Sequence, residues 1–190
     1  MDTINQIIQS FNPMSALATE AIIDLVKYVD YQKNEIFIRE KKRNSSEYFV
    51  LEGVCRSFLY SPEGEEITVS FFQDGSVLSP FTTRTLKGIS NLNFQALTPL
   101  KIGQMDAERF ESLMVENLEI REFGNNVLRN ELKNKVEKEI GMASLTARER
   151  LLKFRESFPL LENLVPHTAI ATYLGISNIS LSRLRGELLK

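Results

Sequence analysis

Near its C-terminal end the sequence carries four side chains whose types and spacing suit hydrogen bonding to a nucleic-acid duplex. They are Asn178, Ile179, Ser182 and Arg183. Because they recur at intervals of one, three and four residues, they share one face of a helix. In a major groove, arginine donates two hydrogen bonds to guanine, asparagine pairs with adenine, and an apolar side chain covers a thymine methyl. We therefore expect this face to contact base edges, with Arg183 as the principal contact.

Neighbouring polar residues have the character of phosphate contacts. Arg185 lies nearer the C-terminal end of the same helix, and His167 and Thr168 begin the preceding helix. Phosphate contacts fix the register of a protein on DNA without reading its sequence. An arginine on an exposed helix is by default a solvated surface cation. For these residues, a contact with DNA is favoured only by the motif in which they lie, which is described next.

The segment from Pro166 to Arg185 has the pattern of a helix-turn-helix, which would position these side chains. Gly175 stands where the turn needs a positive φ, and the small Ala171 allows the second helix to pack across the first. Ser177 is a suitable N-cap for the second helix. An ordinary helical hairpin with a glycine turn is the alternative interpretation. The apolar positions of the shared core are Ile170, Leu174, Ile176, Leu181, Leu184 and Leu188.

The composition is that of a globular protein with one domain of ordinary size and a smaller one. Of the 190 residues, 43% are hydrophobic and 25% are charged. The net charge is −2, yet from Met142 onward seven basic residues face four acidic ones, against 16 and 21 before it. The basic excess lies with the helix-turn-helix. Because this basic excess is small, we expect weak non-specific binding to DNA. Useful affinity for DNA should then depend on base contacts and on dimerisation.

Several functions are disfavoured by what the sequence lacks. No apolar run is long enough to span a membrane, and the first residues lack the basic region of a signal peptide, so we expect a cytoplasmic protein. The single cysteine, Cys55, allows no internal disulfide and no thiolate cage for zinc or an iron–sulfur cluster. Its strand-like surroundings favour a small buried residue over a reactive thiol. We expect no metal, no cofactor and no enzymatic activity, because no constellation of catalytic groups is placed to form a site.

Short strands follow an N-terminal helical segment. Residues 1–30 have helical periodicity in two pieces, the second of which runs through Tyr28. Between residues 35 and 104, turns that contain glycine separate runs of β-forming residues, which favours an antiparallel roll or sandwich. The predicted strands are residues 36–38, 48–51, 54–60, 67–72, 92–97 and 100–102.

A short helix opened by Asp106 leads to a long helix, predicted over residues 117–141 and ended by Gly141. Apolar residues recur along it at spacings of three and four, on more than one seam. One seam can cover the strands, and the other is suited to a second copy of the helix in a two-fold dimer. A single broad seam packed within the monomer is the alternative. The residues assigned to the dimer contact are Phe123, Val127, Leu132 and Val136.

A strand roll, a long helix and a C-terminal helix-turn-helix occur in this order in the Crp/Fnr superfamily of bacterial transcription regulators, which the chain resembles over nearly its full length. The resemblance implies an α+β fold. Residues 1–116 would form N-terminal helices and an antiparallel β-roll of the jelly-roll, cyclic-nucleotide-binding type, residues 117–141 a dimerisation helix, and residues 142–190 a DNA-binding domain. It also implies a homodimer on a palindromic double-stranded operator, with RNA polymerase as a further partner. The residues that carry the resemblance are Tyr48 to Gly53, Arg56, Tyr60, Pro62 to Gly64, Asp74, Gly75, Ile170 to Ser177 and Leu181 to Leu184.

The effector pocket departs from the family members that bind cyclic nucleotides. Those have a Gly-Glu pair whose Glu takes the ribose hydroxyl and, further along the chain, an Arg that pairs with the cyclic phosphate. Here Ser79 and Pro80 stand at the Gly-Glu position, and Ser90, followed by Asn91, stands at the arginine. Arg84 follows Pro80 too closely to replace that arginine without reshaping the loop, although it could attract an anion. The resemblance therefore implies a degenerate pocket that does not bind cyclic AMP, and an unidentified effector or none.

Two function classes follow from the sequence. The first is a dimeric, sequence-specific transcription regulator. The second is a ligand-binding or partner-docking roll with weak or vestigial DNA binding, which the acidic total charge would fit. The sequence also stops directly after the second helix, so the resemblance implies a short or missing wing with fewer phosphate contacts.

Overall fold

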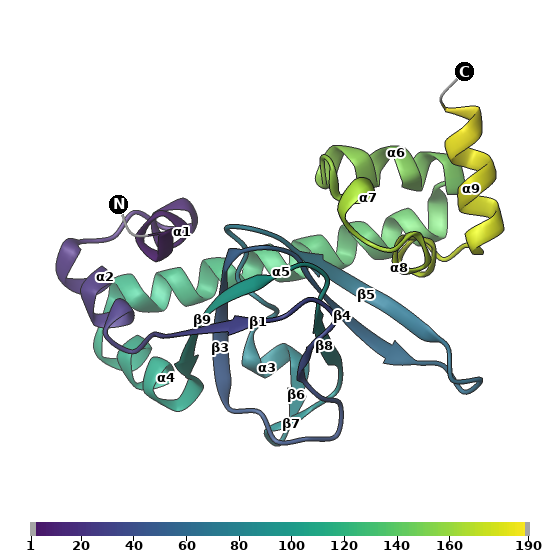
Figure 1. The fold of residues 1–190 in the computed structure, drawn as a ribbon. Coiled ribbons are helices and arrows are strands. Elements are labelled where there is room, and N and C mark those ends of the chain that lie inside the picture. The colour runs from purple at the N-terminus through teal and green to yellow at the C-terminus, as the bar shows by residue number, and fades with distance from the viewer. Residues whose placement is uncertain (1–2, 189–190) are drawn as a thin grey trace.

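The computed structural model describes residues 3–188, and it has N-terminal helices, a roll of β-strands, one long helix and a C-terminal helical domain (Figure 1). The predicted α+β fold with an antiparallel β-roll is confirmed. In chain order the elements are α1 (Thr3–Phe11), α2 (Ala16–Ile23), β1 (Lys27–Tyr31), β2 (Ile36–Ile38), β3 (Ser46–Glu52), β4 (Cys55–Tyr60), β5 (Glu66–Phe72), α3 (Phe81–Arg84), β6 (Thr85–Leu86), β7 (Ile89–Ser90), β8 (Asn93–Ala96), β9 (Leu100–Asp106), α4 (Ala107–Glu116), α5 (Leu118–Ser144), α6 (Ala147–Ser157), α7 (Leu161–Leu164), α8 (His167–Tyr173) and α9 (Asn178–Glu187).

Two antiparallel sheets form the roll, with strand orders β1-β9-β3 and β2-β8-β4-β5, and β6 pairs with β7 in a separate hairpin. Successive side chains of a strand point to opposite faces of its sheet. In β3, Tyr48 and Val50 therefore lie inside the roll, whereas Phe49 between them packs against the helices outside. The interior is closely filled, since the Phe37 ring lies 4.9 Å from the Tyr31 ring and 6.2 Å from the Phe94 ring.

The N-terminal helices and the first half of α5 cover the outer face of the sheet that contains β3. Phe123 of α5 is at the centre of this second core, with ring centroids 6.0 Å from Phe11, 6.3 Å from Phe49 and 6.2 Å from Phe110. From there α5 runs across the molecule to the C-terminal helices at the opposite end (Figure 1). One helix thus contacts both the roll and the C-terminal domain.

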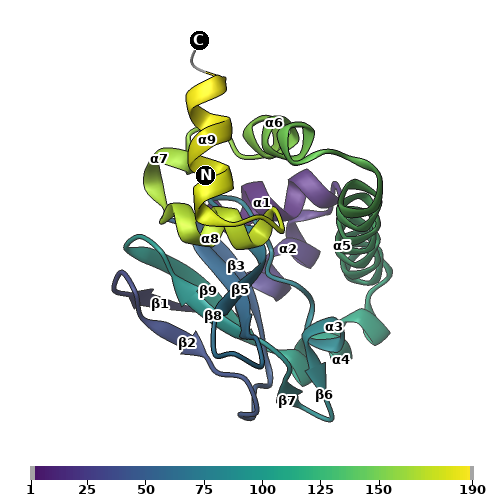
Figure 2. The ribbon, with the colours of Figure 1, turned by 90° about the vertical axis from the view of Figure 1, so that its right-hand side faces the viewer.

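The C-terminal helical domain packs directly on β5 of the roll. Phe71 of β5 lies 5.8 Å from the Phe154 ring, 6.0 Å from Phe158 and 5.2 Å from Tyr173. In addition, the Thr68 amide donates to the Thr172 hydroxyl at 3.1 Å. Figure 2 shows the resulting arrangement, with α6 to α9 at one end of the roll and the β6–β7 hairpin at the other. An aromatic cluster therefore sets the orientation of the helical domain relative to the roll.

Two predicted boundaries were wrong. Tyr28 lies in β1 and not in a helix, because residues 27–31 pair antiparallel with β9, and these ladder hydrogen bonds outweigh the local helical periodicity. The long helix begins at Leu118 after the N-cap Asn117 and continues through Gly141 to Ser144. Gly141 is buried, and a glycine inside a helix costs only about 1 kcal/mol, which is too little to end a well-packed helix.

Across residues 3–188, no helix has the length and apolar character needed to cross a membrane.

Candidate nucleic-acid interface and effector pocket

Helices α8 and α9 form the predicted helix-turn-helix. Gly175 has φ of +67°, and a Cβ atom there would collide with the methyl group of Met142. The Ile176 amide donates to the Ala171 carbonyl at 3.0 Å, and Ala171 is 1% exposed. The turn therefore needs glycine for its conformation, whereas the Met142 methyl group ends a flexible, exposed side chain that can move aside. The Ser177 hydroxyl caps α9 by accepting from the Ser180 amide at 3.1 Å, as the sequence predicted.

The four predicted base-reading residues lie together on the outer face of α9. Leu181 on the inner face is fully buried, whereas Ile179 is 66% exposed. Ser182 and Arg183 are exposed beside it, as is Asn178. The helix stands at the edge of the molecule (Figure 1), so the main body of the chain leaves this face open. Leu189 and Lys190, from which any wing would continue, lie outside the described residues.

Arg185 and His167 are brought together by a network that sequence reasoning missed. Glu162 of α7 forms ion pairs with Arg155 at 2.7 Å and with Arg185 at 2.6 Å. The Arg185 guanidinium also lies 3.1 Å from His167 Nδ1, and Thr168 is exposed next to it. A hydrogen bond from Arg155 holds the pKa of the Glu162 carboxyl below its usual range, and both arginine charges add to this effect. The carboxylate therefore stays ionised and keeps Arg185 in place beside the start of α8.

Arg84, the one cation of the predicted effector pocket, is buried and hydrogen bonded within the roll itself. It is 1% exposed, and its Nε donates to the Ser79 carbonyl at 2.9 Å. Its other two nitrogens donate to the Asn44 side chain and the Ser46 carbonyl. The Glu47 carboxylate lies 3.7 Å away. The expectation that Arg84 could attract an anion is therefore corrected, because its guanidinium is buried and already hydrogen bonded.

Glu47 balances this buried cation. Its two oxygens both accept from the Phe81 amide at 2.9 Å. Burial raises the pKa of the Glu47 carboxyl to about 7, although Arg84 and the Phe81 amide lower it. The pair thus holds the short helix α3 against β3. We interpret it as part of the scaffold of the loop.

The hydroxyl groups of the two serines assigned to the pocket already have partners within the protein. The Ser79 hydroxyl donates to Glu131 of α5 at 2.6 Å, and the Ser90 hydroxyl donates to the Leu92 carbonyl at 2.8 Å. Pro80 is buried at the start of α3, whereas Asn91 is exposed. Ser79 thus links the loop to α5, and the Asn91 amide, which donates to the Arg84 carbonyl at 2.9 Å, keeps residue 91 beside the same short helix.

An exposed apolar seam runs along the second half of α5. Leu132 is 65% and Val136 is 43% exposed, and both were assigned to the dimer contact. Phe123 and Val127 were assigned to it as well, but they are buried in the core against the roll, which corrects their assignment. Their place on the exposed seam is taken by residues at spacings of four. The seam consists of Leu128, Leu132, Val136 and Ile140.

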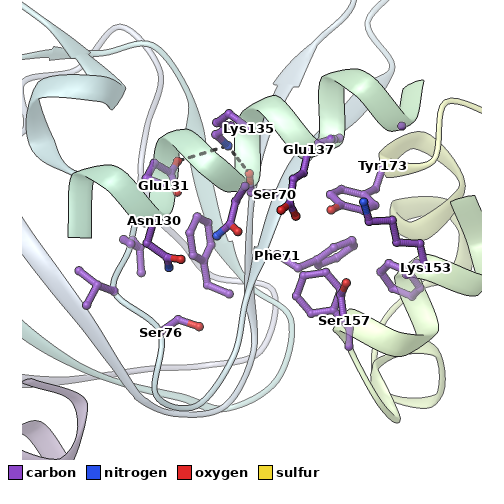
Figure 3. A pocket seen from close by; sticks show the side chains of 18 of the residues that line it. Ser70, Phe71, Ser76, Asn130, Glu131, Lys135, Glu137, Lys153, Ser157 and Tyr173 are labelled. Atoms are coloured by element: carbon purple, nitrogen blue, oxygen red, sulfur yellow. Dashed lines mark hydrogen bonds and ion pairs between the residues drawn. The ribbon is translucent and has the colours of Figure 1, made fainter. Parts of the chain in front are cut away.

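A cavity between the roll, α5 and the helical domain, with a volume of about 420 Å³, was not foreseen from the sequence. We call it the interdomain cavity. Its walls come from β5 and the following loop, from residues 130–142 of α5, and from α6 and α8 (Figure 3). Because these segments are far apart in the chain, only the tertiary structure brings them together.

Comparison with known proteins agrees with this architecture. Residues 28–117 match the cyclic nucleotide-binding domain family. Among solved structures, FixK2 from Bradyrhizobium japonicum is 20% identical, with 86% of this chain and 84% of FixK2 covered and a TM-score of 0.73. A transcriptional regulator from Eubacterium rectale, assigned to the Crp/Fnr family, is 16% identical over 92% of this chain and 85% of its own, with a TM-score of 0.71. The catabolite activator protein of Thermus thermophilus is 17% identical over 94% and 85%, with a TM-score of 0.59.

A search of curated proteins gives no match to the sequence. The solved structures are similar in fold at low sequence identity, and the domain match covers the roll. Residues 28–117 thus match a cyclic nucleotide-binding domain, and the overall fold is similar to that of FixK2, of the Crp/Fnr regulator from Eubacterium rectale and of the Thermus thermophilus catabolite activator protein, as the sequence resemblance implied.

Proposed function

We propose that this protein is a dimeric, sequence-specific DNA-binding transcription regulator whose roll does not bind cyclic AMP. The observation that carries the proposal is the outer face of α9, where Asn178, Ile179, Ser182 and Arg183 are exposed over a buried Leu181. Such a helix presents base-reading groups to a major groove while the preceding helix crosses the phosphate backbone. His167, Thr168 and Arg185 are placed for phosphates, and the ion pair with Glu162 already orients Arg185.

The proposed dimer uses the seam Leu128, Leu132, Val136 and Ile140. Four large apolar side chains in a row on one helix face are typical of a surface that another apolar surface covers. A second α5 satisfies this need by two-fold symmetry. Two recognition helices then lie about one turn of DNA, roughly 34 Å, apart. A palindromic operator follows from that symmetry.

Arg183→Ala is expected to lower the affinity for the preferred sequence by about 1 to 3 kcal/mol and to relax the preference at one base pair, because a bidentate base contact is lost. Arg185→Ala is expected to weaken all sequences alike, because a phosphate contact carries no sequence information. The preferred sequence is first selected from a random duplex pool, and affinities for it and for a scrambled duplex are then compared.

The matched control is Arg109→Ala, an exposed arginine on α4 at the far end of the molecule from α9 (Figure 1). It should leave both affinities unchanged. Equal losses on the selected and the scrambled duplex in Arg183→Ala would show that Arg183 contacts phosphate.

Neither cyclic AMP nor cyclic GMP is expected to bind the roll at physiological concentration. Pro80 replaces the ribose acceptor and Ser90 the phosphate-binding arginine, and Arg84 is held by Ser79, Ser46 and Glu47. Hydrogen bonds to charged groups contribute about 1.5 to 3 kcal/mol each, so losing two contacts weakens binding by roughly two to four powers of ten. Calorimetry with each nucleotide measures this directly. Micromolar binding would contradict the proposed degenerate pocket.

The alternative function is a ligand-binding or partner-docking roll with vestigial DNA binding, which the net charge of −2 favours. A salt series with random duplex DNA separates the two proposals. A regulator that neutralises several phosphates loses affinity steeply as salt rises, because counterions are released on binding. For a docking module, the affinity for DNA should hardly change with salt concentration.

The remaining partners follow from the regulator proposal. We propose that the protein acts in the cytoplasm, where RNA polymerase is a further partner, and that it is a regulator and not an enzyme. Similar folds belong to a catabolite activator and to a Crp/Fnr transcriptional regulator, which supports this class.

A further inference from the structure

One carboxylate holds two arginines together in the helical domain. Glu162 of α7 accepts two hydrogen bonds from Arg155 of α6, one at each carboxylate oxygen, at 2.7 and 3.1 Å. The Nε of Arg185, from α9, lies 2.6 Å from one of the same oxygens. The two guanidinium groups are therefore neighbours around a single anion. We call these three residues the Glu162 triad.

The carboxylate is the most enclosed member of the Glu162 triad. Its side chain is 13% exposed, whereas the Arg155 and Arg185 side chains are 32% and 30% exposed. The Arg185 guanidinium also lies beside His167 at the start of α8, on the surface assigned to phosphate contacts. A phosphate that approaches this surface therefore meets two arginines that are already paired with a negative charge.

Glu162 and a DNA phosphate would compete for the same donors. Carboxylates and phosphates both bind the planar guanidinium group through two parallel charge-assisted hydrogen bonds. The hydrogen bond from Arg155 lowers the pKa of the Glu162 carboxyl, and the charges of both arginines add to this effect, so the carboxylate is ionised at neutral pH. Because Arg155 is bound through two nitrogens, the competition falls mainly on Arg155.

The helical domain has few cations to spare for phosphates. From Met142 onward the sequence has seven basic residues. One of them, Arg150, is used within the domain, where it donates to the Leu145 and Leu174 carbonyls at 2.7 and 2.9 Å. The Glu162 triad has a net charge of +1, whereas its two arginines alone would have +2. One carboxylate thus removes a sizeable part of the charge that attracts DNA.

We propose that Glu162 acts as an internal competitor for DNA phosphate, which withholds Arg155 from the backbone and leaves Arg185 as the phosphate contact of this surface. The affinity for all sequences is lowered alike, because a phosphate contact carries no sequence information. This role on DNA rests on the proposed function. The occupation of Arg155 by the Glu162 carboxylate does not, and it can be tested with a simple anion.

The first test replaces Glu162 by glutamine, which has nearly the same size but no charge, and measures DNA affinity over a salt series. Glu162→Gln should raise the affinity for the selected and for the scrambled duplex by the same factor, roughly tenfold. The slope of log affinity against log salt should become steeper by about 0.9, the value for one further phosphate contact.

Two further variants identify the released group. Glu156→Gln removes the same charge from an exposed position of α6 and should leave the salt slope unchanged. The double variant Glu162→Gln, Arg155→Gln should return the slope to that of the wild type, because the released arginine is absent.

The second test needs no DNA. The arginine Nε–H signals of the full chain are followed by heteronuclear NMR during a titration with inorganic pyrophosphate. The Arg155 signal should stay in place in the wild type and move in Glu162→Gln. Thermal unfolding shows whether that variant is folded. If it is not, the wild type decides, because an Arg155 signal that moves with pyrophosphate overturns the proposal and an unmoved one supports it.

The two tests separate this proposal from the proposed function. Wild-type protein that binds neither duplex contradicts the proposed function, and the pyrophosphate titration then decides whether Glu162 withholds Arg155. If the wild type binds DNA, a folded Glu162→Gln variant with an unchanged salt slope overturns the proposal. A change of slope that Glu156→Gln shows equally also overturns it, because net charge would then be the cause.

Discussion

Leu132→Glu is expected to give a folded monomer with little affinity for DNA. Leu132 is 65% exposed in the single chain, so the charge leaves the fold intact, but in a two-fold dimer it would place two carboxylates inside the apolar seam. Two linked recognition helices commonly bind roughly 10² to 10⁴ times more tightly than one. The DNA affinity of the variant should therefore fall by at least roughly a hundredfold. Light scattering gives the mass in solution, and titration of the selected duplex gives the affinity.

The matched control is Leu17→Glu, because Leu17 of α2 is 77% exposed and lies outside the seam. It should remain dimeric with unchanged affinity. A dimer of undiminished strength in Leu132→Glu would show that the interface lies elsewhere.

Phe71→Ala is expected to detach the helical domain from the roll and to cost about 3 to 5 kcal/mol of stability. The Phe71 side chain is 5% exposed and contacts Phe154, Phe158 and Tyr173, so its loss leaves a cavity in the cluster that joins the two parts. Hydrogen exchange in α8 should accelerate while the interior of the roll stays protected. Mass-resolved hydrogen exchange and chemical denaturation measure the two effects.

Phe94→Ala serves as the control, because Phe94 is fully buried inside the roll and does not touch the helical domain. Its loss of stability should be similar, but the increase in exchange should appear in the roll. Unchanged protection of α8 in Phe71→Ala would mean that the remaining contacts, such as Thr68 to Thr172, hold the domain without the aromatic cluster.

Much of the helix-turn-helix could be predicted from the sequence, because its determinants are local. Gly175 has the positive φ that the turn requires, Ser177 caps α9, and Leu181 is buried. These properties depend on neighbours within one or two helical turns. Strands β2, β3, β4, β5, β8 and β9 were equally accessible, since β-forming runs and glycine turns are recognised within a few residues, whereas β1, β6 and β7 were not predicted.

The side of α5 that faces each partner was decided only by the tertiary structure. Phe123 and Leu132 obey the same helical periodicity, yet one is buried against the roll and the other is exposed. Periodicity shows that a helix has apolar seams, and the docking of α1, α4 and β3 decides which seam they cover. Tyr28 shows the same limit, because its strand depends on pairing with β9, which is far away in sequence.

The burial and the partners of the charged groups were also decided only by the tertiary structure. By itself, the sequence determined that Arg84 and Arg185 are cations and that α9 has an outward polar face. Only the fold decided that Arg84 is buried on Glu47, that Arg185 is held by Glu162, and that Lys138 lies in a cavity without a carboxylate partner among residues 3–188. The physical reason is that burial and pairing of a charge depend on groups from remote segments, whose positions local propensity does not specify.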